Sequence, residues 1–309
     1  MLRLRFTPGD LLRVRLAARP APLIELGMAI ATLRRRDAVF AHWSRRTRLP
    51  RAALPLVELI PPTATGPLFV DPVSDGLEDG LDMVLSTPPE YVRAELTRTC
   101  RATPLTKGLA ARDRDAWRTL EDALRTAYGA IIDRDQERMR ASFAADLSWR
   151  RLLLSEQGVG AALAGVHPAA RWAGTTLEID VPHDGEHDAA GRGVTLLPSA
   201  FWTGRPMVGT HSDGSMLVVY PALNPVPLVD AEAGDALGSL LGRNRAAILE
   251  LLVEHRTTSE LARKLGISAA SASAHAKTLR AAGLVATRRA GKAVVHVATP
   301  LGTRLLMRR

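Results

Sequence analysis

The sequence is poor in cysteine and has no long apolar run. Cys100 is the single cysteine among 309 residues, which excludes an internal disulfide and a zinc site built from several cysteines. The apolar run nearest the start, Ala21 to Leu33, contains Glu25 and is only 13 residues long. A run of that length is too short to span a bilayer, and no signal peptide is recognisable before it. We therefore expect a cytoplasmic protein without a membrane partner.

Catalytic and cofactor signatures are also missing. Gly158-Val-Gly160 begins like a dinucleotide loop, but Leu163 stands at the third glycine position and no strand is expected before it. Ser199 and Ser215 do not lie in the Gly-x-Ser-x-Gly setting of a hydrolase nucleophile. We expect neither an enzyme nor a bound cofactor.

One short segment contains residue types that bind divalent metal ions. His183 and His187 lie among Asp184, Glu186 and Asp188. The segment is predicted to be a loop, so this spacing does not bring the side chains to one face of a helix. A solvated polar loop is the preferred interpretation, and no metal site is predicted.

Acidic residues are scarce at the C-terminal end. Ala236 to Arg309 holds 13 lysines and arginines and 3 aspartates and glutamates, whereas residues 1–235 hold 28 and 29. The formal net charge of the whole chain is +9, so the positive excess lies in this last segment. A compact basic module beside a nearly neutral body is typical of nucleic-acid-binding proteins. The alternative is a basic surface without a partner.

The chain is predicted to have the α+β class and two domains. Asp115–Ile132 and Arg138–Leu154 repeat apolar residues every three or four positions, which indicates amphipathic helices. Between Trp172 and Tyr220 the pattern changes to short β runs separated by glycines. We expect a mostly helical N-terminal sensing or dimerisation domain with a small antiparallel sheet, followed by a second domain. The predicted boundaries are 1–235 (helical over 1–170, β-rich over 171–229) and 236–309.

The second domain has the pattern of a winged helix-turn-helix. Helices are expected over Arg243–Glu254, from an N-cap at Thr258 to Leu265, and over Ser268–Ala282. Gly266 lies between the last two helices, where a tight turn is needed. A hairpin with a basic tip is expected over residues 284–298, and Thr299-Pro300 is expected to start a final helix.

The helix from Ser268 to Ala282 is the expected recognition helix. Ala272, Ala276 and Leu279 are predicted to pack inward, and the opposite face to lie in the major groove of DNA. Alanines on that face can touch a thymine methyl but make no bidentate base contact, so shape readout should contribute strongly. The predicted DNA-binding residues are Ser268, Ala269, Ala270, Ser273, Ala274, His275, Lys277, Arg288, Arg289 and Lys292. For His275, packing or phosphate contact is favoured over base reading.

The tail resembles the ArsR/SmtB family of winged-helix regulators. The segments that carry the resemblance, over about residues 240–309, are Ser259–Ser268, Ser273–His275 and Leu279–Val285. The resemblance implies a dimeric repressor or regulator that binds an inverted-repeat operator and is released or retuned by a signal. The closely spaced cysteines that this family uses for metal sensing are absent here.

The larger N-terminal body shows a looser resemblance. It is similar to the extended N-terminal region of ArsR-like regulators from actinobacteria over Leu11–Leu33, His167-Pro168 and Gly191–Ser199. This likeness implies no known activity.

Four aromatic side chains cluster around the predicted sheet. They are either ordinary core contacts or the wall of a small-molecule pocket, and they are Trp172, Phe201, Trp202 and Tyr220. The sequence thus predicts a sequence-specific transcription regulator that binds double-stranded DNA as a homodimer, and it leaves open whether an unknown small-molecule effector binds to it. The alternatives are an enzyme or ligand-binding protein fused to a DNA-targeting winged helix, and a winged helix that binds another protein.

Overall fold

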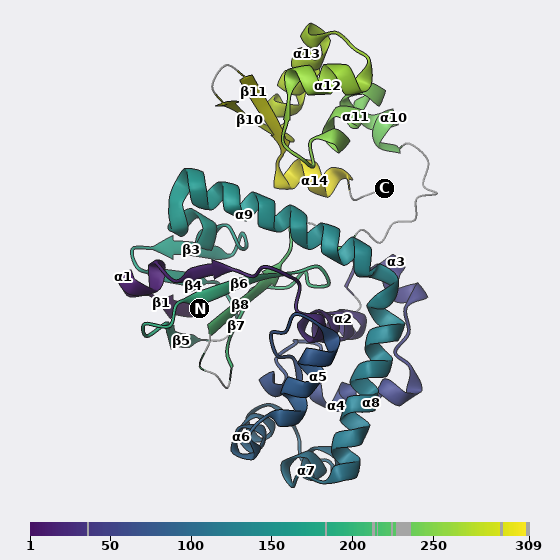
Figure 1. Ribbon diagram of the computed structural model, residues 1–309, viewed down its shortest axis with the longest axis vertical. Helices are drawn as coiled ribbons and strands as arrows, with labels where there is room; N and C mark the ends of the chain where they lie inside the picture. Colours follow the sequence, from purple (N-terminus) through teal and green to yellow (C-terminus); the bar gives the residue numbers. More distant parts are fainter. Residues whose placement is uncertain are drawn as a thin grey trace. The chain divides into compact units, whose positions relative to one another are not determined.

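The chain forms two compact units, Met1–Val226 and Pro227–Arg309, which are described separately (Figure 1). The structure is a computed structural model. The residues it describes are 1–35, 37–182, 184–211, 214, 216–223, 225–226, 236–290 and 293–306.

Helices form much of the first unit. The apolar stripe of α8 (Arg114–Ile131) is buried and packs against α2 (Pro22–Arg35). The Asp113 carboxylate caps α8 by accepting a hydrogen bond from the Ala116 N–H at 2.9 Å. Helix α9 (Gln136–Ala164) has one non-helical residue, Gly158, with φ +81°. The shorter helices are α1 (Pro8–Leu11), α3 (Ala41–Arg46), α4 (Leu56–Leu59), α5 (Leu77–Ser86), α6 (Pro89–Thr99) and α7 (Pro104–Ala110), with 3-10 turns η1 (Arg51–Ala53), η2 (Leu68–Val70) and η3 (Asp133–Asp135). No helix among the described residues is long and apolar enough to cross a membrane.

Two four-stranded sheets complete the first unit. The first has the order β3-β4-β1-β5 and the second the order β2-β6-β8-β7. Their strands are β1 (Leu2–Arg5), β2 (Val14–Leu16), β3 (Ala170–Ala173), β4 (Thr176–Ile179), β5 (Gly185–Asp188), β6 (Val194–Ser199), β7 (Met207–Thr210) and β8 (Met216–Pro221).

The α+β class is confirmed, but the sheets are more extensive than the small antiparallel sheet that was expected. Strands β1 and β2 come from the first 16 residues, within the part predicted to be helical, and each pairs in parallel with a strand more than 170 residues later. Strands β6 and β8 are also parallel. Parallel pairing joins strands that are distant in sequence, so the local turn signals used in the prediction do not reveal it.

The second sheet is covered on both faces. Leu196 and Val218 share a core with Leu4 and Leu177 of the first sheet. On the opposite face of the second sheet, Ser199 donates to Glu25 of α2 at 2.8 Å. This explains the nearly continuous burial of β6 and β8, because a sheet buried on both sides does not alternate.

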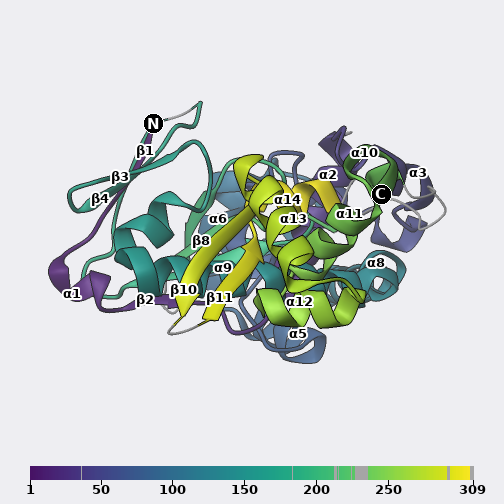
Figure 2. The ribbon, with the colours of Figure 1, turned by 90° about the horizontal axis from the view of Figure 1, so that it is seen from above.

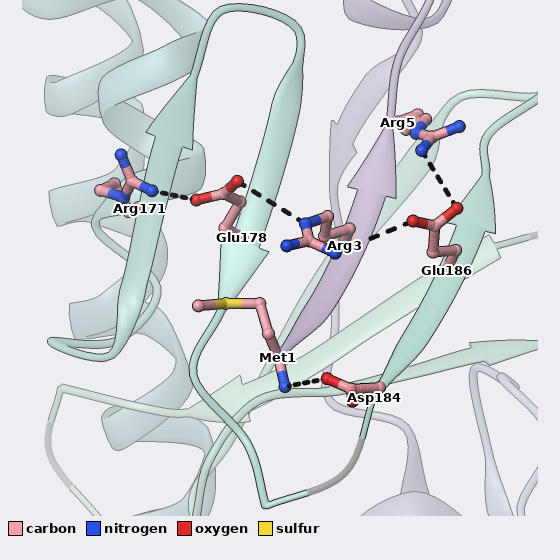
Figure 3. A network of polar contacts seen from close by, with 7 residues as sticks. All are labelled: Met1, Arg3, Arg5, Arg171, Glu178, Asp184 and Glu186. Atoms are coloured by element: carbon pink, nitrogen blue, oxygen red, sulfur yellow. Dashed lines mark hydrogen bonds and ion pairs between the residues drawn. The ribbon is translucent and has the colours of Figure 1, made fainter.

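The outer face of the first sheet carries a row of ion pairs (Figure 3). In β1, buried leucines alternate with exposed arginines, and Arg3 lies between Glu178 and Glu186 with N–O distances of 3.8 Å to each. Arg5 meets Glu186 at 3.0 Å. Figure 3 also shows Arg171 beside Glu178, and the Met1 ammonium beside Asp184. Exposed pairs contribute at most about 1 kcal/mol each, so the buried leucines fix the register of β1.

The second unit contains the winged helix. Its elements are α10 (Ala236–Leu241), α11 (Arg243–Leu251), β9 (Arg256–Thr257), α12 (Thr258–Leu265), α13 (Ala269–Ala281), β10 (Val285–Ala290), β11 (Ala293–Ala298) and α14 (Pro300–Leu306). A three-stranded sheet of order β10-β11-β9 adjoins the helices. Ile248, Leu261 and Leu279, from three different helices, meet in one buried core. The predicted winged helix is therefore confirmed.

Candidate nucleic-acid interface

Local hydrogen bonds fix the turn between α12 and α13. The Thr257 hydroxyl accepts from the Glu260 N–H at 3.3 Å, and the Glu260 carboxylate accepts from the Thr257 N–H at 2.7 Å, which is a capping box. Gly266 ends α12 with φ +64°, a left-handed conformation that suits glycine. Ser268 then caps α13 by accepting from the Ser271 N–H at 3.0 Å.

The cap of α12 is Thr257, not Thr258 as predicted. The Thr258 hydroxyl instead lies 3.0 Å from Nε2 of His296 on β11. Adjacent threonines are equally good caps by residue type. The residue three positions later decides between them, because Thr257 and Glu260 have the spacing of a capping box, whereas Leu261 follows Thr258 at that spacing.

Helix α13 has one buried and one exposed face. Ala272, Ala276 and Leu279 are at most 1% exposed, which confirms that they pack inward. Ser268 is exposed and His275 is half-buried. The remaining predicted contact residues of this helix are all exposed, namely Ala269, Ala270, Ser273, Ala274 and Lys277. The exposed face is thus rich in methyl groups, with the hydroxyls of Ser273 and Thr278 and the ammonium group of Lys277 near its middle.

The hairpin adds cations beside α13. Strand β10 packs against α13, and Figure 2 shows β10 and β11 side by side. Val285 and Ala298 are paired and buried at the base, whereas Arg288 and Arg289 are exposed further along β10. Lys292, the remaining predicted contact residue, lies outside the described residues. The structure therefore brings the exposed face of α13 and two hairpin arginines into one unit.

His296 is a positioning residue that the sequence analysis missed. Its side chain is 5% exposed, with Nε2 at 3.0 Å from the Thr258 hydroxyl and Nδ1 at 2.9 Å from the Thr287 hydroxyl. It therefore ties both strands of the hairpin to α12. Burial first, and the charge of Arg280 second, lower the pKa of His296, which favours the neutral ring. The sequence did offer a signal for this role, because His296 lies two residues before Ala298 in β11 and therefore on the same buried face.

Three further exposed cations were not among the predicted contacts. Arg263 and Lys264 lie in the last turn of α12, and Arg280 lies in the last turn of α13. Basic residues in the last turn of a helix complement the helix dipole.

The four aromatic residues predicted either for the core or for a ligand pocket pack against different neighbours. Trp172 meets Phe6 edge to face, whereas Phe201 packs with Phe40 and Trp43. Trp202 stacks under the Arg35 guanidinium, and the Tyr220 hydroxyl donates to Asp146 at 2.6 Å. Phe201, Trp202 and Tyr220 are at most 3% exposed. This burial agrees with the interpretation as core contacts, and the ligand pocket stays a prediction.

A comparison with family models agrees with this geometry. A model of the MarR family matches residues 241–293, from the end of α10 into β11. Residues 241–293 are a winged-helix domain of the MarR type. This match supports a DNA-binding transcription regulator, but it does not support the more specific resemblance to the ArsR/SmtB family. No curated protein and no solved structure matches the chain.

Proposed function

We propose that this chain regulates transcription by binding double-stranded DNA with α13 in the major groove and the β10–β11 hairpin beside it. The observation that carries the proposal is the exposed face of α13 next to a strand that exposes Arg288 and Arg289. The major groove admits a helix, and guanidinium groups pair well with phosphate oxygens. The scarcity of acidic residues in this unit favours the same partner.

The composition of α13 indicates how the DNA sequence is read. Ser273, Lys277 and Thr278 are the polar side chains in the middle of its exposed face, and the alanines offer only methyl groups. Methyl groups discriminate thymine weakly, so affinity comes mainly from phosphate contacts and specificity largely from DNA shape.

The finer parts of the proposal concern assembly and the sign of regulation. We propose a homodimer that binds two half-sites about one helical turn apart and acts as a repressor. An ArsR-type mechanism remains a prediction from the sequence resemblance alone. We also propose that the chain acts by binding and not by catalysis.

The direct test of the interface is the double variant R288A/R289A. Removing two phosphate contacts should weaken binding on every DNA sequence and reduce the slope of log K against log salt by about 2, since each contact contributes about 0.9. Fluorescence anisotropy across a salt series measures both quantities. The charge-matched control R114A/R118A removes two exposed arginines of α8 in the first unit and should leave the slope unchanged. Equal slopes for the two double variants would contradict the proposed interface.

A further inference from the structure

The first unit contains a cavity that the predicted aromatic residues do not line. Its volume is about 330 Å³, and it lies between α2, the segment from Ala64 to Asp71, helix α6 and strands β7 and β8. Small-molecule sites start at about 300 Å³, so the space accommodates a compact organic ligand. Met28, Leu217 and Val219 give it an apolar wall.

The wall includes an acidic residue that also has a buried oxygen without a hydrogen-bond partner among the described residues. Asp71 lines the cavity, and its buried Oδ1 has no hydrogen-bond partner within the part of the chain that the structure describes. Buried carboxylate oxygens are normally satisfied, so an orphaned one needs an explanation. Burial and, second, the negative charge of Glu95 raise the pKa of Asp71 well above its usual range.

The neighbouring charges are already paired. Glu95 accepts from both Nε and Nη2 of Arg98, at 2.9 and 2.7 Å, and from the Leu68 N–H at 2.7 Å. Arg98 therefore neutralises Glu95, and Asp71 has no counter-ion in this set. A group in the cavity that brings both a hydrogen-bond donor and a positive charge to the Asp71 carboxyl would favour its ionised form.

We propose that this cavity binds a small organic amine, with the ammonium group on Asp71 and the apolar body against Met28, Leu217 and Val219. In a DNA-binding regulator such an amine is the effector, a role that rests on the function proposed above. The site is separate from the winged helix, so its occupancy can be measured without DNA.

The test compares three probes of similar size on the full chain by calorimetry without DNA. They are 2-phenylethylamine, its neutral analogue 2-phenylethanol, and the anionic 3-phenylpropionate. We expect saturable binding of the amine, with affinity at least tenfold higher than for either analogue. Equal affinities, or no saturable amine binding at millimolar concentration, would overturn the proposal, and neither result depends on a variant.

A pair of variants then locates the bound amine. D71N keeps the size of the side chain but removes its charge, and should lower the affinity for the amine at least tenfold. The control D82N changes an exposed carboxylate of α5 and should bind the amine as the unmodified chain does. Unchanged amine affinity in folded D71N would overturn the assignment to this cavity.

The effector role has its own readout. Saturating amine should change the affinity of the chain for its DNA at least fivefold, and D71N should abolish that change. Unaltered DNA affinity with the amine bound would overturn the effector role alone. A chain that binds the amine but no DNA would instead contradict the proposed function and leave the amine site standing.

Discussion

At the scale of single residues, Glu25 is a buried acid held between a helix and a strand. It is 1% exposed and accepts hydrogen bonds from the Ser199 hydroxyl at 2.8 Å and the Ala200 N–H at 2.9 Å. Burial raises its pKa from 4.5 to about 7, and these hydrogen bonds only partly offset the effect. The sequence showed Glu25 within an apolar run, but its partners are about 175 residues away and could not be predicted.

This acid should make stability depend on pH. Between about pH 4.5 and 7 the native state keeps the proton on Glu25 while the unfolded chain releases it, so the free energy of unfolding falls as pH rises through this window. The loss amounts to roughly 3 kcal/mol at 1.36 kcal/mol per pKa unit. The free energy of unfolding, measured by denaturant titration, should fall from pH 5 to pH 8 by more in the unmodified chain than in E25Q. The exposed-site control E90Q should follow the unmodified chain, and an identical pH dependence in E25Q would contradict this account of Glu25.

At the scale of elements, the winged helix was largely predictable and the N-terminal sheets were not. Gly266 and Ser268 signal the turn through their own conformational and capping preferences, and α12 and α13 form where these residues indicate. Strands β1 and β2 owe their existence to partners at the other end of the first unit. The same limit applies to the cavity beside Asp71, whose walls come from segments that only the tertiary fold brings together.

The turn at Gly266 offers a test at this scale. A Cβ atom there would meet no heavy atom within 4 Å, so G266A adds only the strain of a left-handed alanine. We expect the free energy of unfolding to fall by about 1–2 kcal/mol, measured by denaturant titration of the full chain. The matched substitution G174A, at φ +64° in the first unit and also in open space, should cost a similar amount. We also expect G266A to bind DNA more weakly than G174A does. Gly266 lies in the turn that leads into α13, whereas Gly174 lies in the first unit.

At the scale of the whole molecule, the proposal requires two copies of the chain. Two symmetric α13 helices can read two half-sites, whereas one copy reads a single short site. Light scattering after size exclusion should give about twice the chain mass of 33.3 kDa at micromolar concentration. If the mass is that of one chain, both free and on DNA, the proposed dimer is contradicted. The proposed DNA-binding surface of a single copy is not contradicted by that result.

The measurement that tests the central claim most directly is a binding titration of the full chain on the promoter DNA of its own gene and on random DNA of equal length, at two salt concentrations. The account predicts tighter binding to the promoter and a steep loss of affinity for both DNAs at the higher salt concentration, because the interface of α13 and β10 depends on phosphate contacts. Equal affinity for the two DNAs would contradict a sequence-specific regulator. Binding that is absent or insensitive to salt would contradict DNA recognition by this surface.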